Sequence, residues 1–325
     1  MSVNHVIIDK MRQLNIEGAY GKMVLLISLV IGVIIGYKNI VRERFRPIIS
    51  KLFNSIFILM LATLGFKIFA SNEVANNIGN IGILAVFFTV CTCIGSVLIT
   101  LFLINWIYPV NRQREQENDV HVNYSFDLKE AIKPILAIVI GAVFGLLKPN
   151  LAIKHDQLIY WLMLCLILGI GIDIGQSREE LSLVKTVGWL GLIVPLGALT
   201  GSLIGSFMFG LITGMSPIVS MAIGAGSGFY SVTAPLVAQV AGNQYGALAL
   251  ITNFLRETLT IIFLPIIALR FRHPALVTLG GATTMDTTLP VIMRSLGSKA
   301  AMIGLVQGIL LSLFVPIILP IILNM

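Results

Sequence analysis

The sequence predicts an all-α polytopic membrane protein with about eight transmembrane helices, two opposed re-entrant hairpins and internal repeats. Composition is the first reason: the mean hydropathy is +0.94, with 57% hydrophobic and 11% charged residues, against about 25% charged residues in soluble domains. Apolar runs of roughly 18 residues or more, enough to cross a bilayer, recur along the whole chain. The third reason is a duplication in the last third of the chain, which contains interrupted apolar segments.

Eight stretches are continuous enough to be simple membrane helices. They cover residues 22–37, 52–70, 80–108, 133–148, 157–175, 187–213, 245–269 and 300–324. Two further apolar stretches, 217–242 and 274–298, are interrupted by glycine, threonine and proline. These two segments are predicted to be broken at membrane depth.

The first six spans indicate a repeat at an offset of 106 residues. IGSVLITLF at 94–102 matches TGSLIGSFM at 200–208. Because each unit has three spans, the two units would be inverted with respect to each other. The predicted organisation is a three-span unit, a cytoplasmic linker, a second three-span unit and a duplicated transport core, at residues 1–108, 109–132, 133–214 and 215–325.

The C-terminal duplication superposes 224–267 on 279–322 at an offset of 55 residues, without a gap. Each copy opens with a segment rich in glycine and threonine, GAGSGFYSVTAP or GGATTMDTTLP, and closes with a long apolar helix. Paired interrupted segments in an apolar chain point to a transporter's binding site. The alternative is tight helix packing through small residues.

Loop charge predicts the orientation. The loop after the first span is strongly basic and therefore cytoplasmic, with Lys38, Arg42, Arg44, Arg46 and Lys51. If 217–242 is a re-entrant hairpin, Arg270 and Arg272 also fall in the cytoplasm, whereas a broken crossing helix would place them outside. We therefore prefer eight spans with two hairpins to ten spans with two broken helices. Both termini are therefore expected outside.

The hairpin tips are the first candidate for a binding site. Glycines let backbone unwind and let a ligand approach it, while half-helix N-termini attract a carboxylate and free carbonyls attract a cation. The candidates at the tips are Gly226, Ser227, Gly228, Ser231, Thr233, Gly281, Thr284 and Thr288.

Charged residues inside predicted spans form the second candidate set. Burying a charge in a membrane costs free energy, so such residues usually have a function. Glu257, with Asn253 one turn earlier, is predicted to bind a cation or a proton; structural pairing is the alternative. Arg256 points about 100° away on the helix and could hold another carboxylate. Asp286 is a second candidate carboxylate, unless it caps the half-helix that starts at Pro290.

Lys67 and Asp173 are related by the offset of 106 residues. They could form a structural charge pair between the two halves, or each could extend outward from its own membrane edge. No cofactor or metal site is expected beyond a coupling proton or cation, and no nucleic acid is expected as a partner. The sequence contains no HExxH, GxSxG or GxxxxGK[ST] motif, so an enzyme or an ATP-driven pump is not predicted.

Three segments in this order, SGFYSVTAPLV, NFLRETLTIIFLP and GGATTMDTTLPVIMR, resemble the bacterial lysine exporter (LysO) family over roughly residues 200–325. The resemblance implies an inner-membrane exporter of L-lysine and its toxic analogues, driven by a proton or ion gradient. Its motif positions in this sequence are Gly228, Phe229, Tyr230, Ser231, Arg256, Glu257, Thr284, Met285, Asp286, Thr288, Leu289 and Pro290.

The residues themselves thus predict a secondary transporter with an opposed-hairpin core. The resemblance implies that it exchanges a proton or ion for L-lysine or a similar cationic amino acid. Family members tend to carry a further carboxylate in or near the early spans, where 52–70 here has only Lys67. Another amino acid or organic cation is therefore the alternative substrate, and a channel is the alternative mechanism. A homodimer is one option for its assembly.

Overall fold

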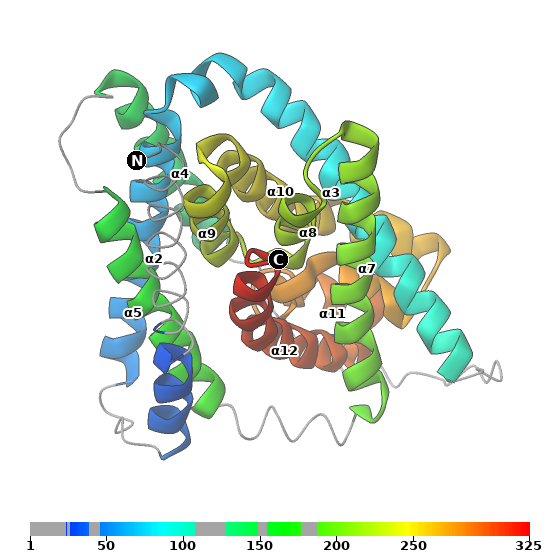
Figure 1. Cartoon of the computed structure of the whole chain (residues 1–325). Coiled ribbons are helices and arrows are strands. Elements are labelled where there is room, and N and C mark those ends of the chain that lie inside the picture. The colour runs from blue at the N-terminus through cyan, green and yellow to red at the C-terminus, as the bar shows by residue number, and fades with distance from the viewer. Residues whose placement is uncertain (1–23, 25–26, 39–45, 108–127, 149–154, 177–186) are drawn as a thin grey trace, which may run out of the picture.

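The fold is a packed set of helices, shown in Figure 1. This computed structural model describes the chain apart from residues 1–23, 25–26, 39–45, 108–127, 149–154 and 177–186. All regular elements in the described part are helical. Most of the predicted linker at 109–132 and the predicted N-terminal location lie outside the described residues.

The described elements follow the predicted order. A short apolar helix over Ile27–Tyr37 comes first. The labelled elements are α2 (Arg46–Phe69), α3 (Asn72–Ile107), α4 (Leu128–Leu147), α5 (His155–Gln176), α7 (Leu190–Thr213), α8 (Pro217–Ala225), α9 (Tyr230–Ala241), α10 (Asn243–Arg270), η2 (Pro274–Met285), α11 (Leu289–Leu296) and α12 (Ser298–Ile322).

Length and composition make five of these helices able to cross a membrane: α2, α3, α7, α10 and α12. Three shorter apolar helices, over Ile27–Tyr37, Leu136–Leu147 and Gln157–Asp173, accompany them. Five and three make the eight apolar helices that the sequence predicts. The all-α polytopic class is confirmed.

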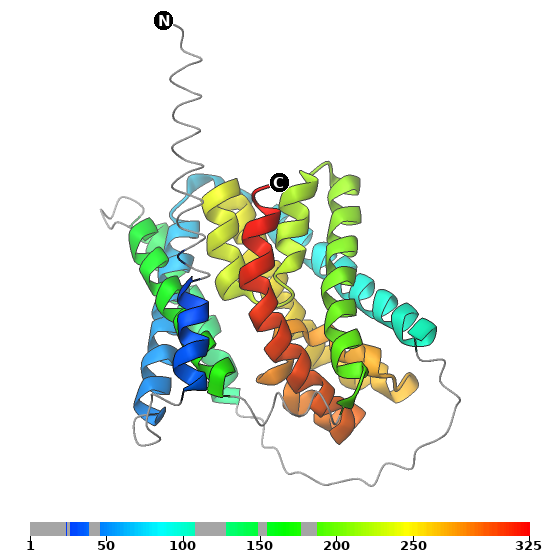
Figure 2. The same ribbon diagram turned by 60° about the horizontal axis from the view of Figure 1, so that its bottom comes forward.

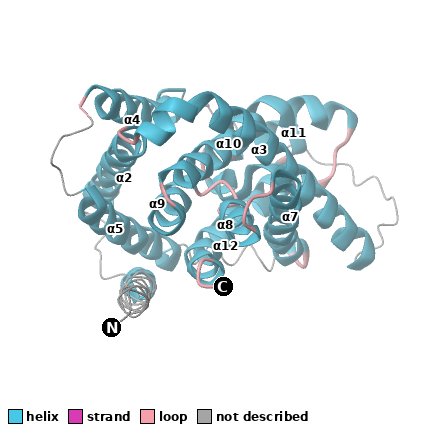
Figure 3. Ribbon diagram, turned by 45° about the horizontal axis from the view of Figure 1, so that its top comes forward, coloured by secondary structure: helices cyan, strands magenta, loops and turns pink. Residues whose placement is uncertain are grey.

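The helices form two bodies, which Figures 1 and 3 show side by side. The four-helix bundle, as we call the first body, comprises the helix over 27–37 with α2, α4 and α5. The core contains α3, α7 and every element after α7. Helix α3 packs mainly on α7 and α10 and only slightly on α2. The third span of each predicted unit therefore packs with the core.

Glycines bring the bundle helices close together in parallel pairs. A side chain on Gly141 or Gly145 of α4 would meet the backbone of α2 at Ala62 or Phe66. Because both numbers increase together, α2 and α4 run in the same direction. The helix over 27–37 pairs in the same way with α5. Small residues allow this approach between apolar helices.

Helices α3 and α7 pack in opposite directions. Gly95 faces Gly201, and Gly205 faces Cys91, so closely that a Cβ on any of these glycines would touch the opposite backbone. Gly95 and Gly201 are related by the offset of 106 residues. In two inverted three-span units, the first span of one unit would pair in parallel with the second span of the other, and the two third spans would pair in opposite directions. The observed pairs follow this pattern. The division into repeat units stays a prediction.

The first hairpin consists of α8 and α9 and enters from one face of the molecule. Helix α8 descends along α7, since Gly210 packs on Ser220 and Gly224 on Ser206. Helix α9 returns along α10, where Gly246 packs against Ala238. The start of α7 lies beside the end of α10 in one apolar cluster. Both ends of the hairpin therefore reach the same face.

The second hairpin consists of η2 and α11 and enters from the opposite face. We call this face the basic face, because it carries Arg270, Arg272, Arg294 and Lys299. Helix η2 begins beside the end of α10, and α11 returns to the level of Arg272. Helix α12 then rises from the basic face to the C-terminus, as Figure 2 shows. The re-entrant arrangement is the one observed, rather than two broken crossing helices.

Side-specific labelling tests this topology. In a variant with all three cysteines replaced by alanine, Thr213→Cys and Gln244→Cys should react with a membrane-impermeant maleimide from one side. Arg272→Cys and Lys299→Cys should react from the other side, because the second hairpin enters opposite to the first. Labelling of Thr213→Cys and Gln244→Cys from different sides would show a crossing helix in place of the first hairpin.

Candidate functional site

The tips of the two hairpins meet inside the core. The backbone N–H of Ala282 donates to the carbonyl of Ser227 at 2.8 Å, and these two residues are related by the offset of 55. Gly281 has a φ of 61°, a left-handed conformation that glycine tolerates. A Cβ at Gly281 would strike the Ser227 carbonyl. The tips therefore lock together rather than leaving a gap between them.

Asn253 of α10 holds the first tip. Its amide oxygen accepts the Gly228 N–H at 2.8 Å, and its amide nitrogen donates to the carbonyls of Ile223 and Ala249, each at 3.0 Å. The side chain is only 2% exposed. Asn253 thus satisfies backbone groups that the break between α8 and α9 would leave unpaired.

Gln307 of α12 holds the second tip. Its amide nitrogen donates to the carbonyls of Val277 at 3.2 Å and Gly281 at 3.0 Å. The Thr284 hydroxyl donates to the carbonyl of Gly304, also on α12, at 2.7 Å. Each tip is therefore fixed by the long helix that follows it in the chain.

Arg256 lies at the centre of the core and is 1% exposed. Its guanidinium donates to the carbonyls of Leu279 (3.0 Å) and Thr278 (2.8 Å) in η2. It also donates to the hydroxyls of Ser96 in α3, at 2.9 Å, and Ser202 in α7. The partners given by the structure are hydroxyls and carbonyls rather than the carboxylate considered from the sequence.

The remaining tip candidates are packed inside the core. The Thr233 hydroxyl donates to the Phe229 carbonyl at 2.8 Å. The buried members of this set, all with little or no accessible surface, are Gly226, Ser227, Gly228, Ser231, Thr233, Gly281, Thr284 and Thr288. These residues shape the tips, and their direct contact with a ligand stays a prediction.

Two carboxylates lie together where the second tip meets α10. Glu257 accepts a hydrogen bond from the Thr287 hydroxyl and is close enough to Asp286 to interact electrostatically. The same hydroxyl lies 3.2 Å from Asp286 Oδ1. Because a hydroxyl has one proton to donate, it cannot serve both carboxylates at once. The acidic pair, as we call Glu257 and Asp286, therefore has capacity for a cation or a proton.

The two members of the acidic pair differ in exposure. Glu257 is 7% exposed, whereas Asp286 has substantial accessible surface although protein surrounds it on most sides. This is the environment of a side chain in a recess. Asp286 does not cap α11, since its Oδ1 accepts from the Thr287 N–H. Among the described residues, no lysine or arginine forms an ion pair with either carboxylate.

Tyr230, the first residue of α9, lies near the acidic pair and within electrostatic reach of both carboxylates. Its ring packs edge to face against the ring of Phe254 in α10, and the two ring centroids are 5.9 Å apart. The ring of Phe57 in α2 is tilted against the Tyr230 ring, with 6.4 Å between the two centroids. Tyr230 thus places the site where the core contacts the four-helix bundle.

Among the described residues, the buried apolar clusters join the two bodies in only one half of the molecule. The cluster in the half away from the basic face combines bundle residues such as Leu64 and Met163 with core residues such as Val237 and Leu319. Near the basic face, the apolar cluster contains described residues of the core alone. The described residues of the two bodies therefore pack on each other mainly away from the basic face.

Lys67 and Asp173 both belong to the four-helix bundle. Phe53 near the start of α2 packs on Gly169 near the end of α5, so these helices run in opposite directions. Lys67 is 14 residues beyond Phe53, about 21 Å along the helix, whereas Asp173 lies one turn beyond Gly169. This geometry disfavours a charge pair and agrees with the alternative, in which each extends from its own membrane edge.

Several site residues were not singled out from the sequence. Phe57 and Gln307 carry no pattern that distinguishes them from neighbouring polar or aromatic residues, whereas Thr287 lies in the second interrupted segment, where the sequence predicts a hairpin tip. Ser96 and Ser202 had a signal: they occupy matching positions in the two segments related by the offset of 106, and their hydroxyls lie 3.1 Å apart. In the described residues, no group of three His, Cys, Asp or Glu side chains could hold a metal ion.

Comparison with known proteins places these features in context. Residues 135–323 match a family model described as lysine exporter LysO. The chain is 28% identical over 310 residues to a protein named lysine exporter LysO from Escherichia coli K12, covering 92% of this chain and 97% of that protein. It is 30% identical over 188 residues to a putative lysine exporter from Haemophilus influenzae Rd, covering 56% and 93% respectively. No solved structure matches the chain.

Replacing Arg256 should destabilise the core. Arg256→Gln leaves buried carbonyls and hydroxyls without a charged donor, at a cost of roughly 3–5 kcal/mol in unfolding free energy. Arg256→Lys should also destabilise, because a lysine lacks the forked donors that reach two helices. Thermal unfolding of the purified protein measures the effect, with Arg270→Gln at the exposed end of α10 as control. A melting temperature for Arg256→Gln equal to that of the control would contradict this role.

Proposed function

The chain belongs to the lysine exporter LysO family, and from that premise we propose that it exports L-lysine and lysine analogues across the bacterial cytoplasmic membrane. The observation that supports this most directly is the acidic pair. Glu257 and Asp286 form no ion pair with a described lysine or arginine, and they lie where the two hairpins and the bundle come together. A site with excess negative charge suits a substrate that carries two ammonium groups.

The chemistry of the site fits an alkylammonium ligand. An ammonium group has three donors, which can be shared among the two carboxylates and the Thr287 hydroxyl. The Tyr230 ring supplies an aromatic surface beside them, and aromatic rings attract cations. Desolvation strengthens these interactions, because the surrounding dielectric is low. The same arrangement favours lysine over neutral amino acids.

We infer that export is coupled to a proton or another cation moving inward. Carboxylates that bind an ammonium can instead bind a proton, so substrate and proton would occupy the acidic pair in turn. Antiport then needs no ATPase, in agreement with the absence of a GxxxxGK[ST] motif from the sequence. The alternative coupling ion is a monovalent metal cation at the same carboxylates.

Alternating access is proposed to arise from movement of the core against the four-helix bundle. The helices within each body are joined by glycine-mediated backbone approach, whereas the bodies contact each other mainly through the apolar cluster away from the basic face. The core would shift so that this contact opens and a matching contact forms near the basic face. Such a shift fits two inverted units.

The proposed orientation places the basic face in the cytoplasm. Arg270, Arg272, Arg294 and Lys299 lie there, and cytoplasmic segments are enriched in such residues. Exposed Trp106 at the end of α3 and Trp189 at the start of α7 lie at the same end, as expected at a membrane interface. The C-terminus would then lie outside. The conformation described here would be open to the cytoplasm.

Lysine efflux from proteoliposomes tests the proposed function. The wild type should release labelled L-lysine, faster with an opposing pH gradient, and Glu257→Gln or Asp286→Asn should reduce the rate at least about tenfold. Each substitution removes a charged hydrogen-bonding partner worth about 1.5–3 kcal/mol. Asp173→Asn, a carboxylate of the bundle away from this site, is the matched control.

The outcomes separate the parts of the proposal. Absence of lysine efflux from folded wild type would reject lysine as the substrate. An efflux rate that does not change with any imposed ion gradient would reject antiport. Efflux without saturation or counterflow would indicate a channel.

A further inference from the structure

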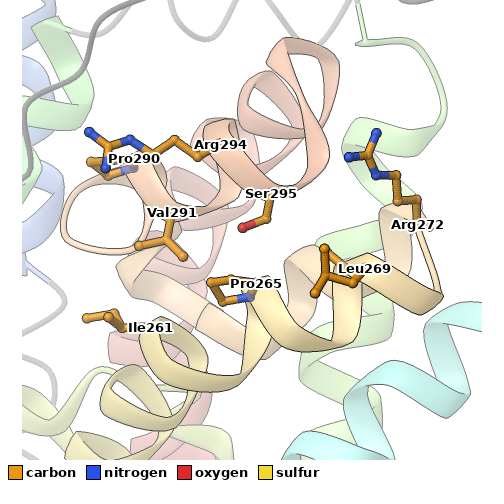
Figure 4. A pocket seen from close by; sticks show the side chains of 9 residues that line it. Ile261, Pro265, Leu269, Arg272, Pro290, Val291, Arg294 and Ser295 are labelled. Carbon is orange, nitrogen blue, oxygen red and sulfur yellow. The ribbon is translucent and has the colours of Figure 1, made fainter.

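A pocket of about 390 Å³ lies between the second half of α10 and α11, and Figure 4 shows its lining. This volume is within the range of about 300–1,000 Å³ found for small-molecule sites. Its floor is apolar, with Ile261, Pro265 and Leu269 from α10 facing Pro290 and Val291 from α11. Its charged lining consists of Arg272 and Arg294, with Ser295 between them.

The pocket begins about one helical turn from the acidic pair along α10. Ile261 lies one helical turn after Glu257 on the same face of α10, and Pro290 follows Asp286 by four residues. The pocket also lies in the half of the core where no described bundle residue joins the apolar packing. The pocket therefore lies between the level of the acidic pair and the basic face.

The two arginines lie at different ends of the pocket. Arg294 extends along α11 toward Pro290, at the inner end, whereas Arg272 lies beyond Leu269 at the outer end. Both side chains are exposed. A guanidinium has five donors in a planar fork that matches a carboxylate and can serve more than one partner. The pocket therefore has a carboxylate-binding group on the basic-face side of the two carboxylates.

We propose that Arg294 binds the carboxylate of the transported amino acid while the acidic pair binds its side-chain ammonium. This inference rests on the proposed export of lysine and adds the residue that recognises the amino-acid end. Ile261, which lines the pocket, lies about one helical turn, 5.4 Å, beyond Glu257 on α10, so the four methylenes of lysine are long enough to extend from the acidic pair into the pocket. Ile261, Pro290 and Val291 would contact those methylenes.

This arrangement separates lysine from similar cations. A diamine such as cadaverine, or an amide such as lysinamide, satisfies the acidic pair but offers no anion to Arg294. A site that hydrogen-bonds a charged group of its substrate discriminates against a ligand that lacks this group, because that ligand forgoes the interaction. The arginine would therefore keep the exporter from releasing diamines that share the alkylammonium end.

Direct binding to the full-length protein tests this assignment. L-Lysine and lysinamide would be titrated by calorimetry into purified wild type, Arg294→Gln, Arg294→Lys and Arg272→Gln in lipid nanodiscs. Arg294→Gln should weaken lysine binding at least tenfold and change lysinamide binding less than threefold. Arg294→Lys should recover part of the affinity for lysine, because it restores the charge. Arg272→Gln, at the outer end, should change either affinity less than threefold.

Each other outcome has a definite meaning. Equal weakening of lysine and lysinamide by Arg294→Gln would overturn the assignment, since it would show a general disturbance of the site. Unchanged lysine binding with loss of a co-purified anionic phospholipid would overturn it in favour of a lipid site. Failure of the wild type to bind or transport lysine would instead reject the proposed function, and this result is distinct from a failure of Arg294 alone.

Discussion

The buried guanidinium of Arg256 is the constraint on which the core depends. A charge at this depth is tolerated only when it is fully hydrogen-bonded, and its partners come from three other elements: α3, α7 and η2. Two of these partners, Ser96 and Ser202, occupy equivalent positions on the antiparallel helices and touch each other. One side chain therefore ties the central helix pair to the second hairpin, and through the Ala282–Ser227 hydrogen bond to the first.

This network changes how the interrupted segments should be understood. Glycine-rich breaks suggest free backbone for a ligand, yet several backbone groups of these segments are already bound by Asn253, Gln307 and Arg256. The hydroxyls of Thr233 and Thr284 donate to carbonyls inside the core. The breaks position two side chains. The second break brings Asp286 to α10 beside Glu257, and the first break makes α9 begin at Tyr230. The tips form a platform, and the proposed chemistry belongs to the few side chains at its edge.

The sequence predicted the hairpins because duplication and loop charge are local or periodic signals. Matching residues at an offset of 55 located both breaks, and Arg270 and Arg272 decided between a hairpin and a crossing helix. The division into two bodies could not be predicted, since an apolar span such as α3 has the same composition whether it faces lipid, bundle or core. The partners of Arg256 and the position of Thr287 depend on long-range packing, and hydropathy carries no information about such packing. The match at an offset of 106 residues placed Ser96 and Ser202 at equivalent positions, but it did not indicate that a guanidinium bridges them.

The acidic pair also suggests why transport would be an exchange rather than a leak. In the proposed mechanism the core carries Glu257 and Asp286 past the apolar surface of the bundle, including Phe57. Moving a bare carboxylate into an apolar environment costs about 2.5–3.5 kcal/mol even on the most permissive insertion scales, and two adjacent like charges add their repulsion. A bound ammonium or proton offsets this cost, so the loaded core can move while the empty, doubly charged core is held back. Coupling of lysine export to proton entry then follows from electrostatics alone, without a separate gate that senses the substrate.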